Sequence, residues 1–334
     1  MWGNRYAHAL AVGAVLGFGG LLFGSPVSAA DLPVKAPPPP SSPWVLDVHG
    51  FFDFNVANTR VTGGGLLLYN TDSLLIQPSV GLALDIYKDP KGFINSFSVF
   101  GGVWNENITD PHGLQAGLRH WQEMDWWAGF SVGFAQHWTF SAQHLEFVFP
   151  WDGTAFNDVF KLAFDDSYWG WPITFNPYFQ VFYTERGGST VIFGKRSGTE
   201  RLEAGIVPTL SLMKPFGIPL TFTAPTWVEF GPSSFWNRND GTTNFCGPTP
   251  AIAVPCPLNN VGYVSSGLQA KYTLESIIPK RLGVWYVRGG VQWVHIVNDA
   301  LLAAQTSVGT AVVANFPQAK RDVAVVSGGF GFSF

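Results

Sequence analysis

The C-terminal fourteen residues constrain the fold more than any other stretch of this 334-residue chain. They read RDVAVVSGGFGFSF, and every second residue from Ala324 to Phe334 is apolar, aromatic or glycine. The residues between them are mostly small or polar. Because successive side chains of a strand point to opposite faces, this pattern predicts a β-strand with one apolar, aromatic face. A strand that ends on an exposed Phe suits a protein whose apolar face meets lipid.

The same alternation recurs along the chain after residue 43 and predicts twelve strands in total. Their ranges are 44–58, 74–88, 93–104, 123–134, 138–149, 158–166, 175–185, 201–211, 220–230, 261–274, 284–297 and 321–334. Most of these segments reach the roughly 9–11 residues that a tilted strand needs to cross a bilayer. In hydrocarbon every backbone amide and carbonyl needs an internal partner, so such strands can span only as a closed barrel. The sequence therefore predicts an all-β, transmembrane antiparallel β-barrel of about twelve strands, with ten to fourteen as the tolerance.

The connections between these strands alternate in length. Short or medium connections follow the second, fourth, eighth and tenth strands, whereas long polar or Gly/Pro-rich stretches cover residues 59–73, 105–122, 186–200, 231–260 and 298–320. Bacterial outer-membrane barrels have short periplasmic turns and longer extracellular loops. An even number of strands also places both termini of the chain on the periplasmic side.

Composition agrees with a surface that faces lipid. Aromatic residues make up 16% of the chain and charged residues only 13%, against about 25% charged residues in a soluble domain. We expect aromatic girdles at the two membrane interfaces, supplied by residues 168–171 (YWGW) and by other tryptophans. The candidates are Trp126, Trp127, Trp138, Trp151, Trp227, Trp285 and Trp293.

The N-terminal residues predict export. Arg5 precedes an apolar segment, and Val27, Ser28 and Ala29 provide small residues for cleavage, so we expect residues 1–29 to be a signal peptide. Residues 30–43 form a proline-rich periplasmic lead, and the barrel covers residues 44–334. Removal of this signal peptide takes away Arg5 and no acidic residue. The remaining chain has 18 basic and 23 acidic residues, a net charge of −5, which argues against nucleic acid as a partner.

Two short stretches resemble a known class of proteins. The C-terminal strand, with Phe330, Phe332 and Phe334 on one face, resembles the closing strand of bacterial outer-membrane β-barrel proteins, which the barrel-assembly machinery reads. The expected mature start, ADLPVKAPP, resembles the N-termini of such proteins from alphaproteobacteria. The resemblance implies a porin-like protein in the outer membrane of a Gram-negative bacterium.

The polar faces of the strands supply the candidate functional residues. If they line the lumen, acidic side chains exceed basic ones, which predicts a channel for small polar solutes or ions with a mild cation preference. An equally physical alternative is that these charges pair across the interior and plug it. The predicted pore-lining residues are Asp47, His49, Asp53, Asp85, Glu123, Asp125, Lys161, Arg201, Glu203, Glu229, Lys271 and Arg288.

Catalysis is not expected. No G-x-S-x-G motif occurs, and the histidines show no H-E-x-x-H or other metal-ligand spacing, so we predict no catalytic residues, no metal and no cofactor. Cys246 and Cys256 lie ten residues apart, and after export we expect them to form a local disulfide. Three functions stay open: a channel, a non-conducting barrel that acts through its long loops, and, less favoured, a barrel enzyme. The expected partners are outer-membrane lipid, the assembly machinery, small solutes and, as a possibility, two further copies in a homotrimer.

Overall fold

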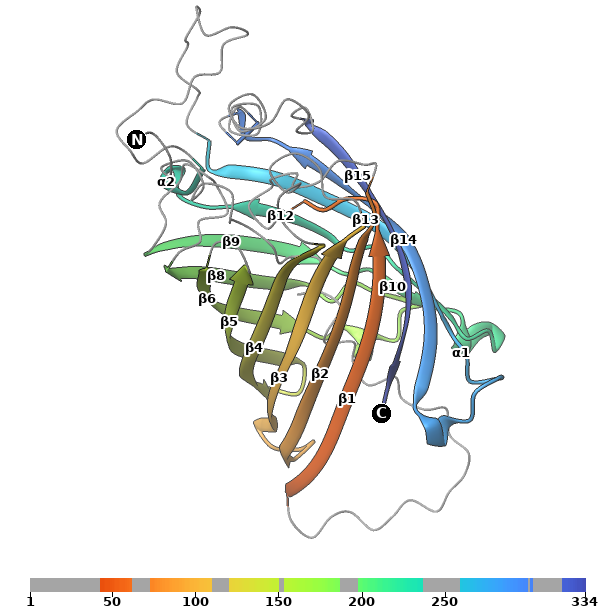
Figure 1. Ribbon diagram of the computed structural model, residues 1–334. Helices are drawn as coiled ribbons and strands as arrows, with labels where there is room; N and C mark the ends of the chain where they lie inside the picture. Colours follow the sequence, from red (N-terminus) through yellow and green to blue (C-terminus); the bar gives the residue numbers. More distant parts are fainter. Residues whose placement is uncertain are drawn as a thin grey trace, which may run out of the picture.

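The chain folds into one antiparallel β-sheet that closes on itself (Figure 1). The computed structural model describes residues 43–61, 73–109, 120–149, 153–186, 198–236, 259–299, 301–302 and 320–334. Its strands are β1 (Trp44–Ala57), β2 (Leu75–Lys88), β3 (Ile94–Ile108), β4 (Trp121–Phe134), β5 (Trp138–Phe149), β6 (Gly153–Phe164), β7 (Ile173–Thr174), β8 (Tyr178–Arg186), β9 (Thr199–Ile206), β10 (Thr209–Ser211), β11 (Leu220–Thr223), β12 (Thr226–Phe230), β13 (Val261–Thr273), β14 (Val284–Ile296) and β15 (Asp322–Ser333). Two four-residue helices, α1 (Met213–Phe216) and α2 (Ser233–Trp236), lie in connections. Within the described part of the chain, no helix has the length and apolarity to cross a membrane.

Three of the spans are each divided into two strands by a proline. Pro177 separates β7 from β8, Pro208 separates β9 from β10, and Pro225 separates β11 from β12. Proline has no N–H to donate to a neighbouring strand, which interrupts the ladder without changing its register. Fifteen strands with three such pairs give twelve spans in the described residues, as the alternation predicts.

Each span pairs with its neighbours in sequence, and the first pairs with the last. β1 lies antiparallel to β15, from Phe51 opposite Ser333 to Ala57 opposite Ser327. Figure 1 shows this junction, where the orange-red strand β1 lies beside the dark blue strand β15. The closing strand predicted from the C-terminal residues is therefore confirmed, and it closes the sheet into a barrel.

The glycines of the closing strand are required by close backbone approach. A Cβ atom on Gly329 would lie 2.0 Å from the Phe54 carbonyl oxygen, and one on Gly331 would lie 2.5 Å from that of Phe52. No L side chain fits there. The inner face of this strand is therefore glycine-rich, while the outer face carries Phe330, whose ring stacks on that of Phe54 at 5.3 Å.

The connections divide the barrel into two ends. We call the end that carries the long connections the loop end, and the end with the short connections, where β1 begins and β15 ends, the turn end.

Two predicted boundaries are wrong. β3 continues to Ile108 rather than stopping at Trp104, and β6 begins at Gly153 rather than Asp158. The fifth-to-sixth connection is consequently short although it lies at the loop end.

The outer face is apolar. Several large outward side chains are at least half exposed, including Val48, Val80, Leu82, Leu268 and Val326. In a protein surrounded by water, a contiguous apolar surface of this kind is rare. It is the exterior expected of a barrel solvated by lipid.

The predicted aromatic positions are distributed differently from expectation. Trp138 and Trp285 lie near the turn end on the outer face, and the predicted Tyr168–Trp171 stretch has exposed rings at the same end. The girdle prediction is wrong for Trp127 and Trp227, because both line the interior cavity and cannot belong to an outer girdle. Trp151, residues 1–42, and the cysteines Cys246 and Cys256 lie outside the described residues, so the signal peptide, most of the lead and the disulfide stay predictions.

Candidate functional site: the barrel interior

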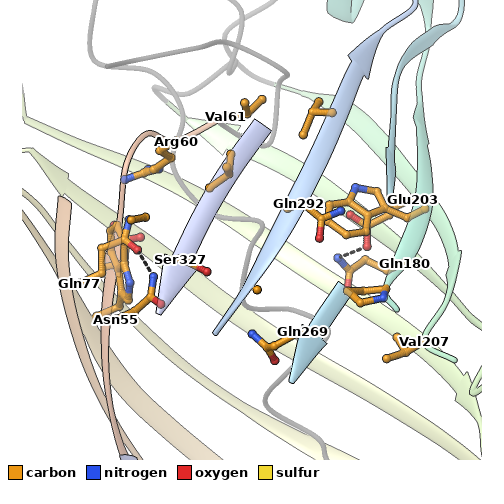
Figure 2. Close-up of a pocket in the computed structure, with 18 of the residues that line it drawn as sticks. Asn55, Arg60, Val61, Gln77, Gln180, Glu203, Val207, Gln269, Gln292 and Ser327 are labelled. Atoms are coloured by element: carbon orange, nitrogen blue, oxygen red, sulfur yellow. Dashed lines mark hydrogen bonds between the residues drawn. The ribbon is translucent and has the colours of Figure 1, made fainter. Parts of the chain in front are cut away.

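The barrel encloses a central cavity of about 230 Å³ to which every one of the twelve spans contributes. Figure 2 shows Asn55, Gln77 and Arg60 on one side of this cavity and Gln180 and Glu203 on the other. Because side chains alternate along each strand, these residues share the inner face with the charged residues predicted from sequence. The cavity and the charges around it form the candidate site.

One wall of the cavity carries what we call the Arg60 cluster: Arg60, Glu106, Glu123 and Asp125. Glu106 and Glu123 lie directly opposite each other on β3 and β4, and like charges in that position repel. Arg60, from the segment after β1, lies between them, 2.7 Å from a Glu106 oxygen and 2.9 Å from a Glu123 oxygen. Its guanidinium also covers the Trp104 ring at 4.9 Å.

A hydrogen-bond chain holds this cluster to the neighbouring strands. The Asn55 amide donates to Gln77 at 2.8 Å, and the Gln77 amide donates to Glu106 at 2.8 Å. Such buried amide contacts fix the carboxylate in place and supply part of the solvation that water would provide.

Asp125 has no comparable support. It is 0% exposed and borders the cavity. Its carboxyl group lies beside that of Glu123, and neither Asp125 oxygen makes a well-formed hydrogen bond within the described residues. The Arg60 cluster thus combines three carboxyl groups with one guanidinium.

The opposite wall carries the Arg201 cluster: Arg201, Glu203, Glu229 and Lys161. Glu203 and Glu229 again lie directly opposite each other, here on β9 and β12. Arg201 forms an ion pair with Glu229, and its guanidinium stacks over the Phe182 ring at 3.7 Å. The Tyr263 hydroxyl donates to Glu229 at 3.2 Å.

Lys161 provides the second positive charge of this wall. Its ammonium group lies 4.5 Å from the centre of the Tyr178 ring and interacts electrostatically with Glu203. The Arg201 cluster therefore has two basic and two acidic groups and is formally balanced.

A third set of charges joins the first span to the eleventh. Arg288 binds Asp53 with two nitrogens, at 3.2 and 2.5 Å, and the Tyr286 hydroxyl donates to the same carboxylate at 2.6 Å. The Lys271 ammonium lies 5.4 Å from the centre of the Tyr286 ring. This bidentate pair reinforces the wall near the junction of β1 with β15.

Apolar and aromatic side chains fill the space between the charged walls. Trp104, Trp127, Leu145, Phe182 and Trp227 border the cavity. Towards the loop end, a buried apolar cluster narrows the interior further. Its members are Phe235, Trp236, Tyr263, Val294, Ile296, Leu301 and Val323.

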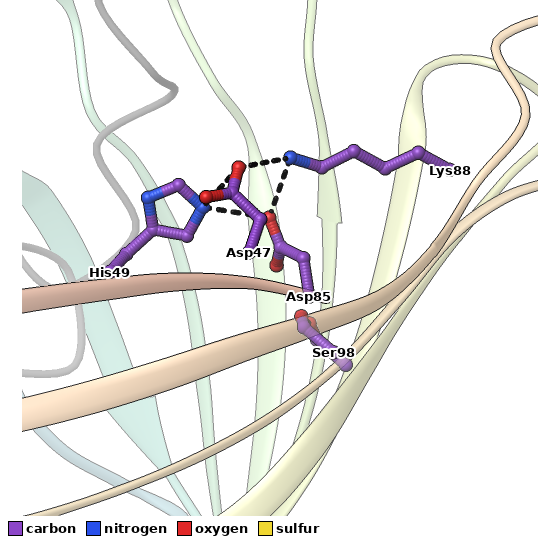
Figure 3. Close-up of polar contacts among 6 residues, drawn as sticks. Asp47, His49, Asp85, Lys88 and Ser98 are labelled. Atoms are coloured by element: carbon purple, nitrogen blue, oxygen red, sulfur yellow. Dashed lines mark hydrogen bonds and ion pairs between the residues drawn. The ribbon is translucent and has the colours of Figure 1, made fainter. Parts of the chain in front are cut away.

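Asp47, His49 and Asp85 form a separate, solvent-exposed cluster at the turn end (Figure 3). The His49 imidazole lies 3.3 Å from Asp47 and 3.0 Å from Asp85. These three residues have ligand atoms close enough to hold a metal ion. However, the Lys88 ammonium contacts both carboxylates, at 3.2 and 2.8 Å, and neutralises part of their charge.

A second group with metal-ligand spacing lies on the outer face. His144, Asp158 and Glu185 come from β5, β6 and β8, and the His144 ring nitrogen is 2.9 Å from an Asp158 oxygen. Neither group was anticipated, because their members are distant in sequence and meet only through strand pairing.

The structure places the predicted pore-lining residues in two regions. Asp53, Glu123, Asp125, Lys161, Arg201, Glu203, Glu229, Lys271 and Arg288 belong to the interior walls; Asp47, His49 and Asp85 belong to the turn-end cluster. Sequence reasoning missed Arg60 and Glu106, which fell in predicted loops. The alternation of Trp104 and Glu106 with Asn105 and Asn107 is the signal that could have extended the third strand.

No protein-family model matches this chain, and no curated protein sequence matches it significantly. Among solved structures, an outer membrane channel from Pseudomonas putida F1 is similar with a TM-score of 0.46 and 8% identity, over 90% of this chain and 100% of that one. The NanC porin has a TM-score of 0.40 and 8% identity, over 85% of this chain and 98% of that one. The transport unit of the Escherichia coli autotransporter AIDA-I has a TM-score of 0.38 and 10% identity, over 93% of this chain and 95% of that one. Scores at this level carry no argument, and the barrel rests on the strand pairing described above.

Proposed function

We propose that this barrel spans the outer membrane of a Gram-negative bacterium and is a narrow, porin-like channel for the passive diffusion of small polar solutes or ions. The observation that carries the proposal is the central cavity to which all twelve spans contribute. A cavity on the axis of a closed sheet is where a solute would pass, and twelve strands lie between small barrels filled by side chains and wide porins. The apolar outer face supports the membrane location.

We also propose a mild preference for cations. The interior walls carry six acidic and five basic residues. The Arg60 cluster has three acids and one base, and the Arg201 cluster has two of each. The set around Asp53 has one acid and two bases, Arg288 and Lys271. Charges that line a pore set its ion selectivity. The excess lies in the Arg60 cluster, so the preference depends chiefly on that wall.

Single-channel recording tests the proposal. The refolded protein without residues 1–29 is inserted in a planar bilayer under a salt gradient, and the reversal potential gives the selectivity. Discrete conductance steps with a cation-selective reversal potential are expected. A correctly folded barrel that never conducts would contradict the channel function.

A second candidate function has its own supporting observation. The apolar cluster around Phe235, Trp236 and Leu301 is almost completely buried and occupies the loop end of the interior. An interior closed in this way fits a non-conducting barrel that binds partners through its long connections. Absence of conductance together with a stable fold would favour this candidate over the channel.

The remaining expectations belong to the same proposal. They are recognition of the strand carrying Phe330, Phe332 and Phe334 by the assembly machinery, an alphaproteobacterial origin, a signal peptide, a disulfide between Cys246 and Cys256, and a possible homotrimer. An enzymatic role is the least favoured function, because most of the interior charges contact one another and no nucleophile–base pair is apparent in the described residues.

A further inference from the structure

We propose that His144, Asp158 and Glu185 bind a divalent transition-metal ion such as zinc on the outer face of the barrel, towards the loop end. The inference goes beyond the proposed channel function and does not depend on conductance. Its basis is a set of one imidazole and two carboxyl groups whose ligand atoms all lie within 4.8 Å of one another.

Strand pairing brings these three residues together. His144 of β5 lies directly opposite Asp158 of β6, and its Nδ1 atom is 2.9 Å from an Asp158 oxygen. On the other side of β6, the register with β8 shifts between Phe156 and Asn157, which leaves Glu185 as an extra residue in β8. A bulge of this kind can re-aim a side chain, and the carboxyl group of Glu185 lies beside that of Asp158.

The two carboxyl groups have no strong positive partner. Like charges this close repel each other, and within the side chains that the structure describes no lysine or arginine lies within ion-pair distance of Asp158 or Glu185. A divalent cation would offset both charges and would also accept the lone pair of the imidazole nitrogen. The turn-end cluster differs, because the Lys88 ammonium already contacts both of its carboxylates (Figure 3). A metal ion there would have to displace Lys88.

The types of ligand atom select the ion. Calcium and magnesium prefer oxygen ligands, whereas an imidazole nitrogen suits zinc, copper, iron or nickel. Zinc can keep three protein ligands and hold water in a fourth position, and the exposure of Glu185 leaves room for that water. The Trp126 and Phe156 rings lie 5.9 and 5.8 Å from the His144 ring, so they limit its rotation.

The position of the set on the barrel allows an ion to reach it. Glu185 is the second-last residue of β8, which ends at Arg186 at the loop end. The side chains of His144 and Asp158 are partly exposed. An outward tryptophan such as Trp126 is typical of the level at which the bilayer meets water. The site therefore lies at the loop-end interface of the membrane, where ions dissolved in water have access.

Zinc binding is measured on the refolded protein without residues 1–29 in detergent micelles. After metal is removed with a chelator, zinc is titrated by calorimetry, with calcium as the comparison ion. We expect saturable binding of zinc at least about tenfold tighter than that of calcium, because one of the ligands is nitrogen. Absence of saturable zinc binding would overturn the proposal, and so would calcium binding of equal strength.

Two variants and one matched control locate the ion. His144→Gln removes the nitrogen ligand, whereas Glu185→Gln removes a carboxylate and keeps the contact between His144 and Asp158. Each should weaken zinc binding at least about tenfold, since the loss of even an outer-shell partner costs roughly 10–100-fold. His49→Gln removes the imidazole of the turn-end cluster and should leave the zinc affinity unchanged. Weakening by His49→Gln alone would contradict the outer site.

Electrophoretic heat modifiability checks that each variant folds. If His144→Gln does not fold, Glu185→Gln decides alone. Cobalt gives a second readout, because the visible absorption of the bound ion changes when a nitrogen ligand is lost. An unchanged cobalt spectrum in folded His144→Gln protein would exclude this imidazole as a ligand.

Metal binding and conductance fail independently. A barrel that binds zinc through Glu185 but never conducts retains this site and loses the channel function. A barrel that conducts but binds no zinc retains the channel function and loses this inference.

Discussion

The Arg60 cluster and the Arg201 cluster share one construction and differ in one residue. Each has two glutamates directly opposite each other on neighbouring strands and one arginine that contacts at least one of them. The fourth member is Asp125 in the first cluster and Lys161 in the second. Two walls with the same frame therefore differ in formal charge: the Arg60 cluster is acidic and the Arg201 cluster is balanced. The difference leads to two expectations: the fourth residue should set the ion selectivity of the proposed channel, and the arginine should hold each wall together.

Removing each arginine is the strongest way to separate the two walls. Arg60→Met leaves three buried carboxyl groups without their cation and should lower the free energy of unfolding by about 3–5 kcal/mol, the usual effect of breaking a buried ion pair. Arg201→Met should have a smaller effect because Lys161 remains. Denaturant unfolding in lipid vesicles, followed by tryptophan fluorescence, measures both. Equal losses would show that the fourth residue does not matter to wall stability.

Changing the fourth residues should move selectivity in opposite directions. Asp125→Asn removes a negative charge from the acidic wall and should lower the cation-to-anion permeability ratio, whereas Lys161→Met makes the balanced wall acidic and should raise it. Reversal potentials in a salt gradient give both ratios from the same preparation. A shift in the same direction for the two variants would break the comparison.

The turn-end cluster gives the smallest expected effect and serves as the exposed reference. Asp47 is 54% exposed and His49 is 47% exposed, so water already solvates their charges. Asp47→Asn should change the free energy of unfolding by only about 0–1 kcal/mol, as is usual for surface ion pairs. The same unfolding assay at low and high salt checks this, and a loss as large as that of Arg60→Met would mean that burial is not what distinguishes the clusters.

Much of the fold could be predicted because alternation of side chains is a local property. The twelve spans and their short connections follow from it, and so does the assignment of Asp53, Asp125 and Glu229 to one face. The interruptions at Pro177 and Pro208 were missed because the side chains around them still alternate. Proline acts on the backbone donor, which the pattern of side chains does not report.

The site could be predicted only in part, because its geometry depends on contacts between distant strands. Sequence identifies Glu123 and Arg201 as inward-facing, but it does not give their partners. Arg60 contributes from a connection after β1, where no periodicity indicates direction. The direct opposition of Glu203 and Glu229 follows from strand register, which is fixed when the sheet closes.

The junction of β1 with β15 has a consequence for how the barrel forms. Every other pair of neighbouring spans is joined by a connection that keeps the partners close along the chain, whereas Phe52 meets Phe332 across almost the whole sequence. Closing so long a segment carries an entropic cost that the hairpins avoid. Folding can therefore proceed hairpin by hairpin, with the junction as the last and slowest pairing. The rings of Phe52, Phe54, Phe330 and Phe332 pack together on the outside of that junction. These aromatic contacts stabilise the one strand pair that no connection holds together.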